Sequence, residues 1–158
     1  MNHPERRGFT LIELVVTLAL VGLLAMMAAP LVELSAQRAR ESDLRRALRD
    51  IRTALDQYKA AAEQGLVERK VGDSGYPPDL ERLATGVRNQ KSPKQELIYF
   101  MRSLPRDPFA PADMPAAATW ALRSHASAPS DPAPGADVFD VHSRAEGTGL
   151  NGVPYREW

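Results

Sequence analysis

The most hydrophobic stretch of the chain lies in its first third and runs without a charged residue from Leu14 to Val32. At about 1.5 Å per residue, a helix over this run is about 28 Å long, which is close to the thickness of the hydrocarbon core of a bilayer. The pattern therefore predicts a membrane-spanning helix over residues 9–32. Pro30 should bend it, because proline removes one helix hydrogen bond and clashes with the preceding turn.

An amphipathic pattern continues the helix over residues 33–63, where hydrophobic residues recur in alternating steps of four and three. This stripe consists of Leu44, Leu48, Ile51, Leu55 and Tyr58. Opposite charges lie four residues apart in three pairs on the other faces, Glu41–Arg45, Arg46–Asp50 and Arg52–Asp56. The helix should end near Gln64 and Gly65, because glycine commonly follows the last turn. The stripe needs a cover from the rest of the chain.

Residues 64–158 predict a small outer domain that supplies this cover. A short helix is expected over Asp79–Thr85, after a turn that contains two prolines. Alternating hydrophobic and polar positions predict strands over Thr119–His125 and Asp137–His142, joined by a loop rich in proline, alanine and serine. The predicted fold class is therefore α+β, with a long N-terminal α-helix and a small C-terminal antiparallel sheet packed on its second half.

Composition and motifs narrow the possible functions. The formal net charge is zero and the arginines are interleaved with acids, so we expect no nucleic-acid partner. There is no cysteine, so no disulfide can stabilise the outer domain. Asp140 and His142 share a strand face without a third partner at a recognisable spacing, which is typical of a solvated face. No zinc-protease motif, nucleophile elbow or phosphate-binding loop is present, and we expect no enzymatic activity.

Glu13 is the only carboxylate at the entrance to the hydrophobic run. A charged side chain in a spanning helix costs about 2.5 to 3.5 kcal/mol at the centre and less near the edge, which suggests a function. Three alternatives remain open on the residues alone. The segment could be a secretory signal peptide with small residues for cleavage at 25–29, or a plain membrane anchor, and Glu13 could simply lie in the headgroup layer.

The motif Gly8-Phe9-Thr10-Leu11-Ile12-Glu13, preceded by two arginines and followed by Gly22 and Pro30, resembles the start of the type IV pilin superfamily. This superfamily includes pilus subunits and the pseudopilins of type II secretion. The resemblance implies that residues 1–8 are a leader, that a prepilin peptidase cuts between Gly8 and Phe9, and that the new amino group of Phe9 is methylated. It also implies that Glu13 neutralises the Phe9 amino group of a neighbouring subunit, which would cancel much of the desolvation cost of both charges.

Two further segments, Tyr76-Pro77 with the short helix after it and Leu104–Phe109, resemble the major pseudopilin of type II secretion. This resemblance implies a homo-oligomeric periplasmic filament that drives protein export. The implied partners are other pseudopilins, the inner-membrane assembly platform, the prepilin peptidase and, before assembly, the lipid bilayer. Two alternatives stay open: a type IV pilus subunit for adhesion, motility or DNA uptake, and a monomeric membrane-anchored binding domain.

Orientation and metal binding also depend on the resemblance. Arginines outnumber acids just after the apolar run, and a positive-inside count would place the outer domain in the cytoplasm. The resemblance implies the opposite, a single-pass inner-membrane protein with a periplasmic C-terminal domain, and we follow it. Major pseudopilins commonly hold calcium in the C-terminal loop. Here the side-chain candidates in the loop after His142 are Glu146 and Asn151, whereas calcium prefers six to eight ligands, so the site should be reduced or absent. No other cofactor is expected.

Overall fold

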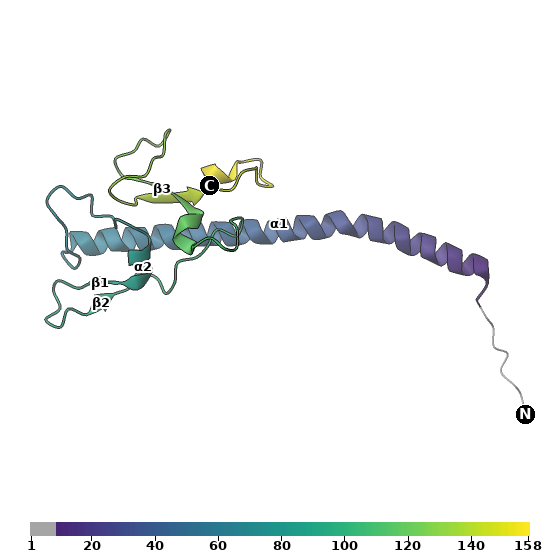
Figure 1. Ribbon diagram of the computed structural model, residues 1–158, viewed down its shortest axis with the longest axis horizontal. Helices are drawn as coiled ribbons and strands as arrows, with labels where there is room; N and C mark the ends of the chain where they lie inside the picture. Colours follow the sequence, from purple (N-terminus) through teal and green to yellow (C-terminus); the bar gives the residue numbers. More distant parts are fainter. Residues whose placement is uncertain (1–8) are drawn as a thin grey trace, which may run out of the picture. The chain divides into compact units, whose positions relative to one another are not determined.

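The computed structural model describes residues 9–158, apart from the side chains of residues 27–29. Helix α1 (Leu11–Glu63) is continuous through Pro30 and ends at the predicted residue (Figure 1). The chain divides into two compact units, Met1–Ala39 and Arg40–Trp158, so α1 contributes to both. The bend at Pro30 and the predicted boundary between residues 32 and 33 stay predictions, and the leader, residues 1–8, lies outside the described residues.

The second unit contains all the other elements, which follow the second part of α1 in the chain. They are α2 (Glu81–Thr85), β1 (Val87–Arg88), β2 (Leu97–Ile98), the 3-10 helix η1 (Ala116–Thr119), β3 (Trp120–Arg123), β4 (Asp140–Ser143) and the 3-10 helix η2 (Tyr155–Glu157). Strands β1 and β2 pair antiparallel, and so do β3 and β4. The predicted α+β class is confirmed, although the sheet consists of two separate two-stranded ladders.

Both predicted strands of the outer domain form, with shorter or shifted bounds. In the β3–β4 ladder, Trp120 lies opposite Ser143 and Arg123 lies opposite Asp140. The second strand begins three residues later than predicted, because the backbone N–H of Val138 donates to the carbonyl of Pro77, at 2.8 Å, instead of joining the ladder. This bond ties the start of β4 to the proline-rich turn before α2.

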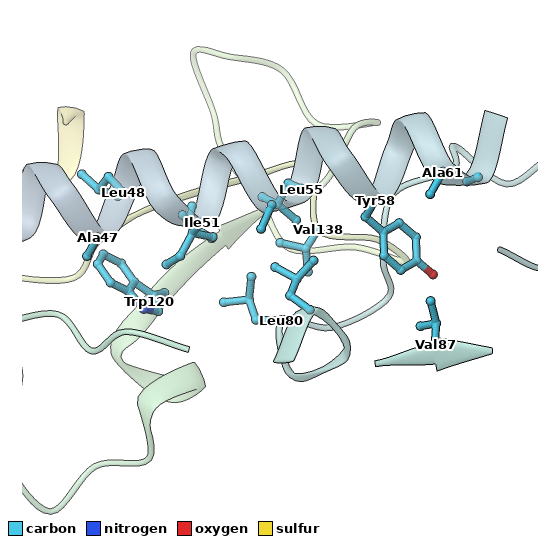
Figure 2. Close-up of a cluster of buried hydrophobic side chains, with 14 of the residues drawn as sticks. Ala47, Leu48, Ile51, Leu55, Tyr58, Ala61, Leu80, Val87, Trp120 and Val138 are labelled. Carbon is cyan, nitrogen blue, oxygen red and sulfur yellow. The ribbon is translucent and has the colours of Figure 1, made fainter. Parts of the chain in front are cut away.

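The hydrophobic stripe of α1 is buried, as its periodicity predicts. Leu44, Ile51 and Leu55 are at most 1% exposed. Figure 2 shows the side chains that cover this stripe. They are Leu80 beside the start of α2, Val87 from β1, Trp120 from β3 and Val138 just before β4. Burying one large aliphatic side chain stabilises a fold by about 1.5 to 3 kcal/mol, so this layer is the main source of stability in the second unit.

The Leu104–Phe109 segment is held by polar bonds to the β3–β4 ladder. Asp107 is 1% exposed, and its carboxylate accepts a hydrogen bond from the Ser143 hydroxyl at 2.5 Å. The indole N–H of Trp120 donates to the carbonyl of Pro105 at 2.9 Å. The segment thus anchors the chain on the ladder as well as on the core.

Of the three ion pairs predicted along the helix, one forms and two are replaced. The ion pairs of these arginines are Glu41–Arg45 at 3.6 Å, Arg46–Asp43 at 3.7 Å and Arg52–Asp140 at 2.8 Å. Asp140 lies on β4 and is partly buried. Water therefore screens its attraction for Arg52 less than it would screen the attraction of an exposed acid on the helix. A tertiary partner therefore displaces the predicted local one.

Candidate membrane-spanning and assembly segment

Helix α1 begins with an N-cap at Thr10. The Leu14 N–H donates to the Thr10 carbonyl at 3.1 Å, and the Glu13 N–H donates to the Thr10 hydroxyl oxygen at 3.2 Å. A threonine cap with a glutamate three residues later is the capping-box spacing, so the sequence itself carries a signal for this helix start. Glu13 therefore lies in the first turn, where the helix dipole favours a carboxylate.

The hydrophobic residues of the first unit are exposed in the single chain. Every described side chain from Phe9 to Met26 is exposed, including Phe9 at 84% and Ile12 at 70%. An 18-residue window of α1 has a mean hydropathy of 2.5 and no buried residue. By length and composition, this helix can cross a membrane. An apolar surface of this extent needs lipid or other helices around it.

The predicted processing and assembly residues are only partly described. Gly8 lies outside the described residues, while Phe9 and Glu13 are both exposed. Within residues 9–158, the structure contains no ion pair to the Glu13 side chain, and a partner on another subunit lies outside a single chain. The roles of Gly8, Phe9 and Glu13 stay predictions.

A buried carboxylate holds the C-terminal loop on α1. Glu41 is 3% exposed, and one of its carboxylate oxygens accepts hydrogen bonds from the Leu150 N–H at 2.8 Å and the Tyr155 hydroxyl at 3.1 Å. Helical spacing predicts only the pair of Glu41 with Arg45. Leu150 and Tyr155 lie more than a hundred residues away in the sequence, where no local spacing could indicate them.

The two calcium candidates do not form part of a larger ligand group. Glu146 and Asn151 are exposed, and the Asn151 side-chain oxygen accepts a hydrogen bond from the Val153 N–H at 3.1 Å. Among residues 9–158, no three His, Cys, Asp or Glu side chains gather closely enough to hold a metal ion. The expectation that the calcium site is reduced or absent remains a prediction.

A hollow of about 1480 Å³ lies in the second unit and is lined in part by Tyr58, Tyr76 and Asp137. The Asp137 carboxylate accepts hydrogen bonds from the Ser124 hydroxyl at 2.7 Å and the His125 N–H at 2.8 Å. Burial opposes ionisation of Asp137, but these hydrogen bonds and one from a neighbouring serine outweigh it and lower the pKa of Asp137. Asp137 thus ties the start of the β3–β4 loop to its end.

This chain matches one family model and two known proteins. The family model for the prokaryotic N-terminal methylation motif matches residues 4–29, a range that includes Gly8, Phe9 and Glu13. The chain carries a prokaryotic N-terminal methylation motif. The motif also covers most of the exposed apolar segment of α1.

Two relatives match beyond the motif, and both are named type II secretion system core protein G. The relative from Klebsiella michiganensis is 26% identical over 113 residues, which cover 69% of this chain and 72% of the relative. The relative from Dickeya chrysanthemi is 30% identical over 109 residues, 66% of this chain and 64% of the relative, so the matched region spans less than two thirds of that protein. No solved structure gives a significant match. The predicted resemblance to the pilin and pseudopilin superfamily is confirmed.

Proposed function

We propose that this chain is a pseudopilin, a subunit that assembles into a short periplasmic filament of a type II secretion system. The observation that carries the proposal is the methylation motif at the head of an exposed apolar helix, on a chain that is similar to core protein G beyond the motif. The function is mechanical, and we expect no enzymatic activity.

The proposed mechanism follows from the exposed part of α1. Prepilin peptidase removes residues 1–8, and the subunit waits in the inner membrane with lipid around residues 9–32 and with its outer domain in the periplasm. On assembly, helices of neighbouring subunits replace the lipid around this segment. Lipid tails are as apolar as the helix, so van der Waals packing between helices, and not burial from water, drives this association.

Glu13 sets the register in this mechanism. A carboxylate and an ammonium are each costly to bury alone, while a buried pair cancels much of that cost. We propose that Glu13 pairs with the amino group of Phe9 on the next subunit. The position of Glu13 in the first turn of α1 supports this, because it keeps the carboxylate at the level of the chain's new N-terminus.

Other pseudopilins and the inner-membrane assembly platform are the proposed partners. A type IV pilus subunit is the second candidate, and a monomeric membrane-anchored binding domain is the third. Both matched relatives are named for type II secretion, which favours the first candidate over the pilus.

The test is a complementation experiment in a host that lacks this gene. The Glu13→Ala protein should be processed and inserted in the membrane but should lower export at least tenfold, because removing one member of a buried charge pair costs about 3 to 5 kcal/mol. Glu33→Ala removes another exposed carboxylate of the same helix and is the matched control, with normal export expected. Normal export by the Glu13→Ala protein would reject the assembly role, and a deletion that abolishes surface pili but leaves export intact would favour the pilus.

A further inference from the structure

The outer domain covers only one face of the second part of α1. Its residues bury the stripe through Leu44, Leu48 and Ile51, while the opposite face is exposed. The exposed side chains on that face are Ser42, Arg45, Arg46, Arg49, Thr53, Asp56, Gln57 and Ala60. No segment within residues 9–158 covers this face, so it is open to another molecule.

Two unpaired opposite charges stand on this open face. Arg49 and Asp56 are seven residues apart, which is nearly two helical turns, so they point in almost the same direction about 10.5 Å apart along the axis. Among the described residues, neither forms an ion pair. The neighbouring arginines differ, since Arg45 contacts Glu41 and Arg46 contacts Asp43.

The two charges fit a second copy of the same helix. If every copy crosses the membrane in the same direction, their helices are parallel. A shift of two turns along the axis then brings Arg49 of one copy beside Asp56 of the next. Thr53 and Ala60 lie on the same side of the helix and are small, so they allow two helix backbones to approach.

We propose that the open face of α1 is a contact between subunits, in which Arg49 of one copy pairs with Asp56 of the next. This inference rests on the proposed function, which supplies the parallel orientation. The contact is heterologous, because each copy uses Arg49 toward one neighbour and Asp56 toward another. A heterologous contact that does not close into a ring repeats as a helical filament.

The absence of cysteine from the sequence permits a direct test by cross-linking. In an Arg49→Cys/Asp56→Cys variant, the two sulfurs of one chain cannot join, because their Cα atoms are about 10.5 Å apart and a disulfide needs less than about 7 Å. Every disulfide of the variant must therefore link two chains, and a regular ladder in steps of the subunit mass identifies both as copies of this protein. We expect oxidation of host membranes that contain the full-length variant to give a ladder of multimers.

The matched control is Asp43→Cys/Asp50→Cys, which has the same spacing and exposure but lies off the open face, one residue further around the helix. It should remain monomeric. A dimer as the largest product of the Arg49→Cys/Asp56→Cys variant would indicate a closed contact and overturn the proposal, and so would monomer alone or an equal ladder from the control.

Exchange of the charges provides a second measurement. Co-purification of two differently tagged copies, with the tags in the exposed loop at residues 128–135, reports assembly. Arg49→Asp and Asp56→Arg should each lower co-purification about fivefold, and the double exchange should restore it. If unmodified copies co-purify but neither the ladder nor the rescue appears, this contact is wrong and the proposed function stands. If unmodified copies do not co-purify, both fail.

Discussion

Replacement of Glu41 tests whether a single buried carboxylate holds the C-terminal loop on the long helix. Glu41→Ala removes the acceptor for the Leu150 N–H and the Tyr155 hydroxyl. Glu41→Gln keeps a carbonyl oxygen in the same place and removes only the charge. Asp43→Ala is the control, because Asp43 belongs to the same helix but makes an exposed ion pair with Arg46.

The magnitudes follow from the two hydrogen bonds and from burial. A hydrogen bond to a charged group contributes about 1.5 to 3 kcal/mol, and a buried donor left without a partner costs about 1 to 3 kcal/mol. We therefore expect Glu41→Ala to lower the free energy of unfolding by about 3 kcal/mol. Glu41→Gln should cost about 1 kcal/mol, because both donors keep an acceptor. The exposed control should change the free energy by at most about 0.5 kcal/mol.

The assay is urea denaturation of the full chain in detergent, followed by tryptophan fluorescence. The chain has only two tryptophans, and both report on the second unit. Trp120 lies in the buried core, while Trp158 lies under the guanidinium of Arg45, 4.4 Å from its carbon to the ring centroid. Equal losses for Glu41→Ala and Glu41→Gln would refute the hydrogen-bond argument. A loss for Glu41→Ala no larger than that of the control would refute the role of Glu41 altogether.

Two further predictions concern the second unit. Asp137 has a lowered pKa, so its stabilising contribution is complete above the ordinary value of 3.8 and is lost as the pH falls below it. The difference in unfolding free energy between wild type and Asp137→Asn should therefore shrink as the pH falls below about 4, and a difference that grows below that pH would contradict this. Gly86 has φ 85° and ψ 159°, a conformation open almost only to glycine, so Gly86→Ala should lower the unfolding free energy by about 1 to 3 kcal/mol in the same assay. An unchanged midpoint for Gly86→Ala would show that this backbone conformation relaxes at little cost.

Periodicity was sufficient to predict the parts of the fold that depend on one face of one element. The stripe of α1 through Leu44, Ile51 and Leu55 repeats at helical spacing and is buried. The end of the helix at Glu63 follows from the glycine two residues later. Both are local properties of the chain, so the sequence contains them directly.

Contacts between distant segments could not be predicted in this way. Helical spacing predicts an ion pair between Arg52 and Asp56, yet Arg52 bonds to Asp140, 88 residues away. Glu41 likewise bonds to the C-terminal loop. Both choices depend on which charges the fold brings together in partly buried places, and that depends on tertiary packing. The strand bounds also depend on tertiary contacts. The backbone N–H of Val138, inside the predicted strand, donates to the carbonyl of Pro77 in the turn before α2.

At the candidate site, the sequence says more about function than the structure of one isolated subunit does. The motif around Gly8, Phe9 and Glu13 is visible in the residues and matches the family model. The structure adds the N-cap at Thr10, which the Thr-x-x-Glu spacing could have predicted. The partner proposed for Glu13 belongs to another subunit, so one chain cannot contain it.

Analysis of the N-terminus tests the central claim most directly. The protein would be isolated from host membranes with an active prepilin peptidase, and its intact mass and N-terminal peptide would be determined by mass spectrometry. The account predicts a chain that begins at Phe9 with a methylated amino group. A chain that still begins at Met1 would contradict the account and leave a simple membrane anchor, whereas cleavage near Ala29 would indicate a signal peptide and a secreted soluble domain.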